Sequence, residues 1–375
     1  MIALILLYGS YALGCLMAWL TWLWMKTPTV AQNYEPSTKI TVVIPVRNEA
    51  QTILRLLECI DQQQFPSALI EVIVVNDNST DDTKEKVEQF VKTARFRGVV
   101  LDVMPTEAQT SPKKRAITKA VAQASGELIV TTDGDCWMGP NWLRVIESQL
   151  LSTGANMICG PVTFGADGSV FTNLQIVEFA SLVGAGAVSL ALKLPSMCNG
   201  ANLAYRKVIF EEVKGFEGSE EVASGDDEFL MHKFFAHNPE KVHFLKSEQA
   251  IVFTQALPDW NSFKNQRRRW ASKWKKYQNW QVSALAIYIF MVNFGLIISS
   301  LMAVFGKING IDIGLLLALK WIPEWLFLAE VLTFLGHSNK RWWILSTQWV
   351  YPFYVTFFGL LAQQKGYEWK GRKLA

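Results

Sequence analysis

Cysteine and histidine are scarce, and their spacing excludes two common kinds of site. The five cysteines include no close pair and no Cys-x-x-Cys, and the four histidines have no metal-ligand spacing. A disulfide framework and a structural zinc site are therefore excluded, and reduced thiols of a cytosolic protein fit better. His232 lies near Asp227 in the sequence, but a surface or structural role is its simpler interpretation. The cysteines are Cys15, Cys59, Cys136, Cys159 and Cys198.

Charged side chains are absent from residues 1–25. This segment is long enough to cross a bilayer, which needs about 20 apolar residues. A signal peptide is disfavoured, because no charged region precedes the run and no small-residue cleavage site follows it. Residues 282–305, 313–335 and 342–361 are further candidate spans. The middle one carries Lys320, Glu324 and Glu330, so it is expected to face other helices or water, or to be re-entrant.

Acidic residues are also absent from residues 264–276, which hold seven basic ones. The positive-inside rule places this flank, and with it residues 35–280, in the cytosol, and the N-terminus outside. The basic C-terminal tail also looks cytosolic, whereas three full spans would place it outside. A middle segment that does not span would remove this conflict. The tail's basic residues are Lys365, Lys370, Arg372 and Lys373.

Strand-like and helix-like segments alternate after the linker at residues 26–38. The expected strands are 39–46, 69–75, 98–104 and 127–132, and the expected helices are 50–61, 81–92 and 113–124. Ser79 or Thr80 is the expected cap of the second helix. Further on, we expect a strand over 156–164, a buried or surface-lying helix over 171–192 and a helix over 229–236. The pattern predicts an α/β fold with a mainly parallel sheet.

The sequence Asp133-Gly-Asp135 directly follows the fourth expected strand. Side chains two apart on an extended backbone point to the same side, so the carboxylates would converge on one point. Such oxygen ligands suit Mg²⁺ or Mn²⁺, although an Asp-Gly-Asp turn without a ligand is the alternative. Arg47–Glu49 and Asp77 also follow strands. Ligands collect at these carboxyl ends in parallel sheets, which favours the metal.

Two later groups of polar residues point to chemistry or to a membrane surface. Asp226, Asp227 and Glu228 open a helix, where they would complement its dipole, and Asp227 is also a candidate general base. Gln266, Arg269 and Trp270 share one helical face. Aromatic and basic residues alternate along the same helix, as on a helix lying on an anionic membrane. Nucleic-acid binding is disfavoured by the candidate span that follows.

The motifs occur in an order that resembles the family 2 membrane glycosyltransferases over residues 39–280. The resemblance implies a GT-A fold, a nucleotide-sugar donor, a divalent metal and inverting chemistry. The motifs are Val43-Ile-Pro45-x-Arg-Asn-Glu49, Val75-Asn-Asp77-Asn-Ser79-Thr, Lys113-Lys-x-Ala116-Ile, Asp133-Gly-Asp135, Gly200-Ala-Asn202, Gly225-Asp-Asp227 and Gln266-Arg-Arg-Arg269-Trp270.

The resemblance also implies a role for each matching residue. Val46 and Glu49 would flank the nucleotide base, and Asp77 would accept a hydrogen bond from a uracil N–H, although a turn or cap role is its alternative. Lys113 would lie near the nucleotide. Asp135 would hold the metal, and Asp133 the ribose or metal. Asp227 would be the base, with Asp226 in the place of the family's glutamate. Gln266 and Arg269 would reach the diphosphate, and Trp270 would cover the acceptor.

We therefore expect an integral membrane enzyme that transfers a sugar from a UDP-sugar to a lipid-linked or glycan acceptor. Its expected place is a bacterial inner membrane, with the catalytic domain in the cytosol. The alternatives are a processive polysaccharide synthase, a catalytically inactive membrane scaffold that binds nucleotide, and a nucleotidyltransferase. The expected regions are a membrane helix (1–25), a linker (26–38), a GT-A domain (39–257), an amphipathic helix (258–280), a C-terminal membrane region (281–363) and a basic tail (364–375).

Overall fold

The computed structural model describes residues 1–31, 33–103, 111–222, 224–271, 280–361, 367–369 and 372–374. These residues form two compact units. One consists of Met25–Gly165 and Ser189–Gln255, and we call it the α/β unit. The other consists of Met1–Trp24, Ala166–Val188 and Ala256–Ala375, and we call it the helical unit. Parts of the expected amphipathic helix and basic tail, including Trp274, Tyr277, Lys365 and Lys370, lie outside the described residues.

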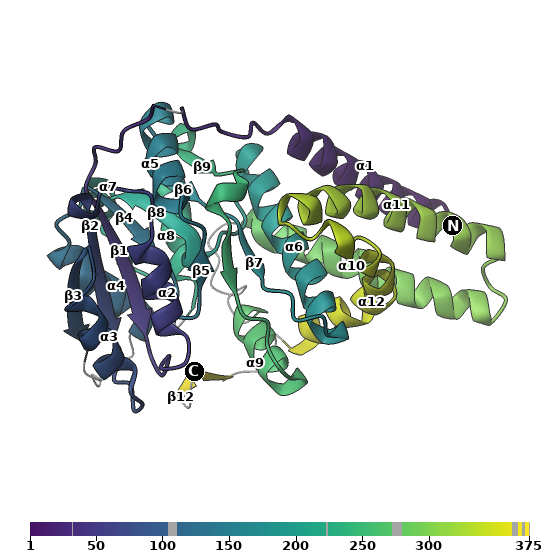
Figure 1. Cartoon of the computed structure of the whole chain (residues 1–375). Helices are drawn as coiled ribbons and strands as arrows, with labels where there is room; N and C mark the ends of the chain where they lie inside the picture. The colour runs from purple at the N-terminus through teal and green to yellow at the C-terminus, as the bar shows by residue number, and fades with distance from the viewer. Residues whose placement is uncertain are drawn as a thin grey trace. The chain divides into compact units, whose positions relative to one another are not determined.

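The α/β unit is built on a seven-stranded sheet with the order β3-β2-β1-β4-β8-β6-β9 (Figure 1). The first four strands in the sequence are parallel to one another, as the alternating pattern predicts. Strand β8 is antiparallel to both of its neighbours. The strands are β1 (Ile40–Val46), β2 (Ile70–Asn76), β3 (Arg97–Asp102), β4 (Leu128–Thr131), β6 (Met157–Cys159), β8 (Leu203–Arg206) and β9 (Val242–Phe244).

Both faces of the central strands are buried, which explains why their sequences are apolar without interruption. Val43 of β1 and Ile73 of β2 join a core cluster with Ala116 and Ala120 of α4. Val42, on the opposite face of β1, is also fully buried. The helices of this unit are α2 (Ile53–Asp61), α3 (Thr83–Val91), α4 (Pro112–Gln123), α5 (Trp142–Thr153), α7 (Lys207–Glu212) and α8 (Asp226–His237).

The single strand expected over residues 156–164 was a wrong prediction. The chain forms two strands there, β6 and β7 (Val162–Phe164), which belong to different sheets. Pro161 has no N–H for a strand ladder, and Gly160 donates its N–H to the carbonyl oxygen of Asn202 at 2.7 Å. The second sheet has the order β5-β10-β7, with β5 at Trp137–Met138 and β10 at Val252–Thr254.

The expected cap of the second helix was also wrong. Helix α3 begins at Thr83, and Asp81 Oδ1 accepts a hydrogen bond from the Thr83 N–H at 3.1 Å. Ser79 instead accepts a hydrogen bond from the N–H of Asn48 at 3.1 Å. The Ser79 hydroxyl therefore joins the loops after β1 and β2, and it does not begin the helix.

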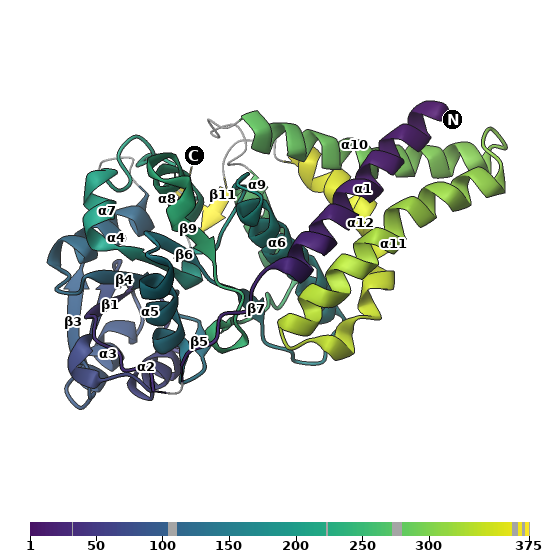
Figure 2. The ribbon, with the colours of Figure 1, turned by 90° about the horizontal axis from the view of Figure 1, so that it is seen from above.

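The helical unit contains six α-helices among its described residues. Helix α1 packs along α11 (Figure 2). Between these two helices, the Trp22 ring contacts the rings of Phe327 and Phe334. Lys320 of α11 is fully buried and lies 2.7 Å from Glu324, which also accepts a hydrogen bond from Tyr11. These charges thus face other helices, one of the arrangements expected. The helices are α1 (Ile2–Trp24), α6 (Val170–Ala191), α9 (Trp260–Ala271), α10 (Trp280–Val304), α11 (Gly310–Phe334) and α12 (Trp343–Leu361).

Three helices in the described part of the chain are long and apolar enough to cross a membrane, namely α1, α6 and α10. The sequence favours a buried or surface-lying helix at α6. In the structure, 61% of the most apolar 18-residue stretch of α6 is buried. Helices α11 and α12, which contain the candidate spans 313–335 and 342–361, are not among the three. A short hairpin, β11 (Tyr367–Trp369) and β12 (Arg372–Leu374), follows them.

Candidate active site

The loops after β1 and β2 are joined by hydrogen bonds at the carboxyl edge of the sheet. Arg47 Nη1 donates to the carbonyl oxygens of Asp77 and Asn78, both at 2.8 Å. Asn48 Oδ1 accepts from the Thr80 N–H at 2.8 Å, and the Glu49 N–H donates to Thr83 Oγ1 at 2.8 Å. These bonds fix the loop that the sequence analysis assigns to the nucleotide base.

Asp77 lies next to Val46 in this pair of loops. Its N–H donates to the carbonyl oxygen of Val46 at 2.9 Å, and its side chain is only 5% exposed. Arg115 Nη2, from α4, lies 3.7 Å from Asp77 Oδ1. A carboxylate held this way, in a buried position at a strand end, is suited to accept a hydrogen bond from a planar base.

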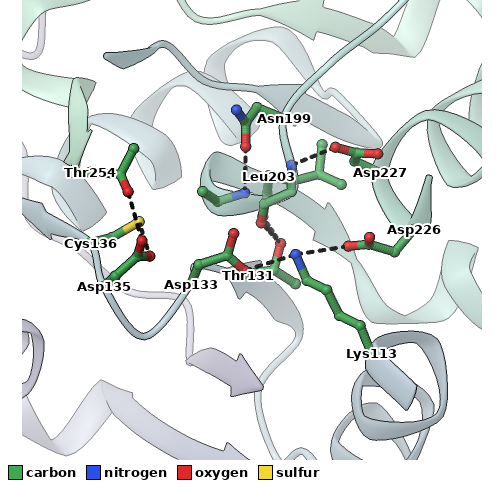
Figure 3. Close-up of polar contacts among 12 residues, drawn as sticks. Lys113, Thr131, Asp133, Asp135, Cys136, Asn199, Leu203, Asp226, Asp227 and Thr254 are labelled. Carbon is green, nitrogen blue, oxygen red and sulfur yellow. Dashed lines mark hydrogen bonds and ion pairs between the residues drawn. The ribbon is translucent and has the colours of Figure 1, made fainter. Parts of the chain in front are cut away.

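The Asp133-Gly134-Asp135 segment is a turn and not extended backbone. The Cys136 N–H donates to the carbonyl oxygen of Asp133 at 3.1 Å, so the alternation that predicts convergence of the two carboxylates does not apply. Asp133 is directed toward Lys113, whereas Asp135 Oδ2 accepts a hydrogen bond from Thr254 Oγ1 at 2.9 Å (Figure 3). A Cβ at Gly134 would lie 3.0 Å from both Val46 Cγ1 and Glu49 Cγ, so glycine permits the close approach of the β1 loop.

Lys113 joins carboxylates from two distant parts of the chain. Its Nζ lies 2.7 Å from Asp133 Oδ1 and 3.1 Å from Asp226 Oδ2 (Figure 3). Burial alone would lower the pKa of Lys113, but the charges of Asp133 and Asp226 outweigh it and raise this pKa above the ordinary lysine value. The lysine is therefore a fixed positive charge within an acidic cluster.

Asp227 is oriented by two backbone groups at the N-terminus of α8. Its Oδ2 accepts from the Gly200 N–H at 3.0 Å, and its Oδ1 accepts from the Glu228 N–H at 2.8 Å. These two hydrogen bonds hold the carboxylate in one orientation, as a group that receives a proton requires. The site leaves little room for a side chain at residue 200, because a Cβ there would lie 2.9 Å from Asp226 Oδ2 and 3.3 Å from Lys113 Nζ.

Asn202 has a role that the sequence analysis did not assign. Its side chain is 1% exposed. The Asn202 Nδ2 donates to the carbonyl oxygens of Pro161 and Ala250, both at 2.8 Å, and its Oδ1 accepts from Trp142 Nε1 at 3.0 Å. This amide therefore ties three segments together directly behind Gly200. Thr254, the partner of Asp135, was also missed, because 119 residues separate the two in sequence.

The remaining predicted residues, Gln266, Arg269 and Trp270, lie on α9 in the helical unit. The Gln266 Oε1 accepts a hydrogen bond from Arg267, and the Trp270 ring lies 6.1 Å from the ring of Phe179 between centroids. The structure thus brings Lys113, Asp133, Asp226 and Asp227 together within the α/β unit.

The carboxylates of the turn after β4, Asp133 and Asp135, fit a divalent ion that binds together with a nucleotide. No group of three metal-ligating acidic, histidine or cysteine side chains occurs among the described residues. Mg²⁺ and Mn²⁺ commonly use one or two protein carboxylates and take their other ligands from water and substrate phosphates. Asp135, with its orientation fixed by Thr254, meets that requirement. Asp133, 38% exposed in its side chain, can add a second ligand only by turning from the Lys113 ammonium.

Two family models match the chain. The first, described as glycosyl transferase family 2, matches residues 41–214. The second, described as glycosyl transferase family group 2, matches residues 128–362, which is more than half of the chain. The chain belongs to the family 2 glycosyltransferases. The family that its motifs resemble is confirmed.

Individual relatives match only part of their own length. Glycosyltransferase AglE of Haloferax volcanii is 32% identical over 150 residues, which cover 38% of this chain and 48% of that protein. The probable glycosyltransferase YdaM of Bacillus subtilis is 25% identical over 251 residues, which cover 65% of this chain and 57% of that protein. The chain thus spans about half the length of these curated relatives.

A solved structure supports the fold of this member of the family. The mannosyltransferase PcManGT of Pyrobaculum calidifontis, in complex with GDP-mannose and Mn²⁺, superposes with a TM-score of 0.56 at 17% identity, and the alignment covers 96% of each chain. Identity at this level establishes the fold alone. The predicted GT-A fold, with its mainly parallel sheet, is confirmed.

Proposed function

We propose that this glycosyltransferase moves a sugar from a nucleotide-sugar, a UDP-sugar in our assignment, to a membrane-associated, lipid-linked acceptor with inversion. The observation that carries the proposal is the cluster of Lys113, Asp133, Asp226 and Asp227 at the carboxyl end of β4, in the parallel part of the sheet. In open α/β sheets, this edge is where ligands bind. The cluster offers both a place for a diphosphate–metal complex and a carboxylate base.

The proposed reaction is a single displacement at the anomeric carbon. The acceptor hydroxyl oxygen forms a bond to that carbon, and the bond from the carbon to the diphosphate oxygen breaks. Asp227 takes the hydroxyl proton, and the nucleoside diphosphate leaves with the bonding electron pair. Attack from the face opposite the leaving group inverts the anomeric configuration. The two N–H groups that Asp227 accepts from hold its carboxylate in one orientation.

The other residues are proposed to bind the donor. Asp77, Val46 and Glu49 would contact the base, and Asp133 and Asp135 would hold Mg²⁺ or Mn²⁺. The ion, when bound, neutralises the negative charge that develops on the leaving diphosphate. Lys113 would add a fixed positive charge near the nucleotide. Gln266 and Arg269 would reach the diphosphate, and Trp270 would cover the acceptor.

A lipid-linked acceptor is supported by the candidate membrane helices α1, α6 and α10 and by the basic α9 helix with Trp260 exposed. A basic helix with exposed aromatic residues, such as α9, is typical of helices that lie at a membrane surface, where a lipid acceptor is presented. A processive polysaccharide synthase is the second candidate. It is favoured by the 24% identity over 156 residues to the poly-β-1,6-N-acetyl-D-glucosamine synthase of Staphylococcus epidermidis.

A donor panel with purified protein tests the proposal. UDP- and GDP-sugars are incubated with Mn²⁺ or Mg²⁺, with and without a membrane lipid extract, and both the nucleoside diphosphate and the glycosylated product are measured. We expect lipid-dependent release of UDP and a product that carries one sugar of inverted configuration. A long polymer made by the purified protein would favour the synthase, and GDP release alone would correct the nucleotide. Release by none of the donors would contradict the proposed transfer.

A further inference from the structure

Helix α6 contacts α9 through one continuous face within the helical unit. The Gln175 amide of α6 forms two hydrogen bonds with the backbone of Leu257, which precedes α9. Its Nε2 donates to the Leu257 carbonyl oxygen at 2.9 Å, and its Oε1 accepts from the Leu257 N–H at 3.0 Å. Three residues further along, Glu178 forms an ion pair with Arg267. Spacings of three and four residues bring side chains to one helix face, so α6 holds both the start and the middle of α9.

The ion pair between Glu178 and Arg267 is almost completely removed from water. Glu178 is 8% exposed and Arg267 is 3% exposed. The guanidinium contacts both carboxylate oxygens, with Arg267 Nε 3.0 Å from Glu178 Oε1, and Tyr354 of α12 donates to the same oxygen at 2.7 Å. A buried pair of this kind adds little net stability compared with apolar residues of similar size. The main effect of the pair is therefore on the geometry of the two helices rather than on stability.

Arg267 occupies the second position of the Gln266–Trp270 motif, and it contacts two of the motif residues. Its Nη1 donates to Gln266 Oε1. Its guanidinium carbon lies 4.3 Å from the centroid of the Trp270 ring and 4.4 Å from that of Phe263, so the group lies against both aromatic faces. The planar guanidinium can stack and donate in fixed directions at the same time, which a lysine ammonium cannot do.

We propose that Arg267 and Glu178 are positioning residues for sugar transfer. Glu178 fixes the guanidinium on α6, and the guanidinium fixes the Gln266 amide and the Trp270 ring in the orientation that they need for the diphosphate and the acceptor. This inference rests on the proposed function of Gln266 and Trp270. It assigns to α6, otherwise a candidate membrane helix, the task of supporting the motif helix.

Two variants separate positioning from stability. Arg267→Lys keeps the positive charge beside Glu178 but loses the stacked, planar donor. The exchanged pair Glu178→Arg with Arg267→Glu restores an ion pair between the helices but removes the guanidinium from α9. We expect each to lower kcat/KM for transfer roughly 10- to 100-fold, the range found for residues in direct contact. We also expect the exchanged pair to recover the Tm that Glu178→Arg alone loses, without recovering activity.

The matched control is the buried pair of Lys320 and Glu324 in the same unit, which contacts no motif residue in the described contacts. Replacing it with Lys320→Met and Glu324→Gln should change kcat/KM less than about 3-fold for a comparable change in Tm. Two results would overturn the positioning role and leave Arg267 with a structural one. In the first, kcat/KM falls in proportion to Tm in both sets of variants. In the second, the exchanged pair recovers kcat/KM together with Tm.

A second measurement separates this inference from the proposed function. If Arg267 acts through Gln266 and Trp270, then Arg267→Lys should cause less than about a 3-fold further loss of kcat/KM in a background that carries both Gln266→Ala and Trp270→Ala. Independent, multiplicative losses would overturn the inference while leaving the proposed function intact. If Gln266→Ala and Trp270→Ala both retain wild-type kcat/KM, the proposed role of the motif fails, and the positioning role falls with it.

Discussion

The ammonium of Lys113 lies 2.7 Å from Oδ1 of Asp133, one of the two carboxylates that the sequence analysis assigns to a metal. The protein's own cation therefore compensates the acidic cluster. Because burial is outweighed by the neighbouring carboxylates, the pKa of Lys113 is raised, and the lysine keeps its charge throughout the neutral range.

This ion pair has a defined pH dependence. A group whose pKa is raised on folding contributes its full stability below its unfolded pKa, about 10.4 for lysine, and loses it only as the pH rises through the folded value. Lys113→Met should lower the free energy of unfolding by about 2 kcal/mol. Chemical denaturation should give the same difference from wild type at pH 7, 8 and 9. A difference that shrinks over this interval would show that Lys113 titrates there.

Gly200→Ala should impair the site more than the fold. The added Cβ would lie 2.9 Å from Asp226 Oδ2 and in contact with Asp227 Cβ at 3.5 Å, so the Asp226 carboxylate must shift beside Asp227. We expect kcat to fall at least 10-fold, since misplacement of a catalytic group by about 1 Å can cost 100-fold. Gly139→Ala is the matched control, because nothing lies within 4 Å of a Cβ there. Equal kcat for both variants would contradict the assignment of Asp227 and Asp226 to the reacting region.

Asn202→Ala should destabilise the α/β unit. It removes the partner of Trp142 Nε1 and of the Ala250 carbonyl oxygen, whereas the Pro161 carbonyl oxygen keeps the Val252 N–H as a donor at 3.1 Å. Each unsatisfied buried group costs about 1–3 kcal/mol, so a total loss of roughly 2–4 kcal/mol is expected after partial relaxation. Chemical denaturation measures it, with the exposed Gln123→Ala as the surface control. A loss below about 0.5 kcal/mol, typical of surface substitutions, would show that these groups find other partners.

Thr254→Val tests the metal through the residue that orients its ligand. The hydroxyl of Thr254 donates to Asp135 Oδ2 at 2.9 Å, and valine has the same shape without a donor. Loss of such a supporting partner commonly weakens metal affinity about 10- to 100-fold. The Mn²⁺ concentration for half-maximal activity should rise accordingly, while the maximal rate at saturating Mn²⁺ changes less. An unchanged Mn²⁺ requirement would argue against Asp135 as a ligand.

The sequence sufficed to predict the parallel strands and the residues at their ends. The apolar runs of β1, β2 and β4 are continuous, and polar residues follow each run at once, so Asp77 and Asp133 could be placed at one edge. The approach of Asp226 to Lys113 could not be predicted, because 113 residues separate them and the antiparallel β8 intervenes. The supports of the site were missed for the same reason. Glu178 and Arg267, like Asp135 and Thr254, are neighbours only after folding.

Two local errors also have physical causes. Asn156 to Phe164 is apolar enough for one strand, but Pro161 cannot donate to a ladder and the chain changes sheet there. The alternation rule for Asp133 and Asp135 fails, because the chain turns directly after β4 and is no longer extended there. Regular periodicity thus predicts elements well, whereas it does not describe the turns in which the candidate site residues lie.

The most direct test of the central claim compares wild type with Asp227→Asn in the donor panel. The asparagine keeps the shape and the acceptor oxygen for one backbone N–H, but it cannot take the proton of the acceptor hydroxyl. We predict that the variant binds UDP with the affinity of the wild type, measured by calorimetry, and loses at least 100-fold in the rate of sugar transfer to lipid extract, the contribution typical of a general base. Wild-type transfer by Asp227→Asn would contradict the account.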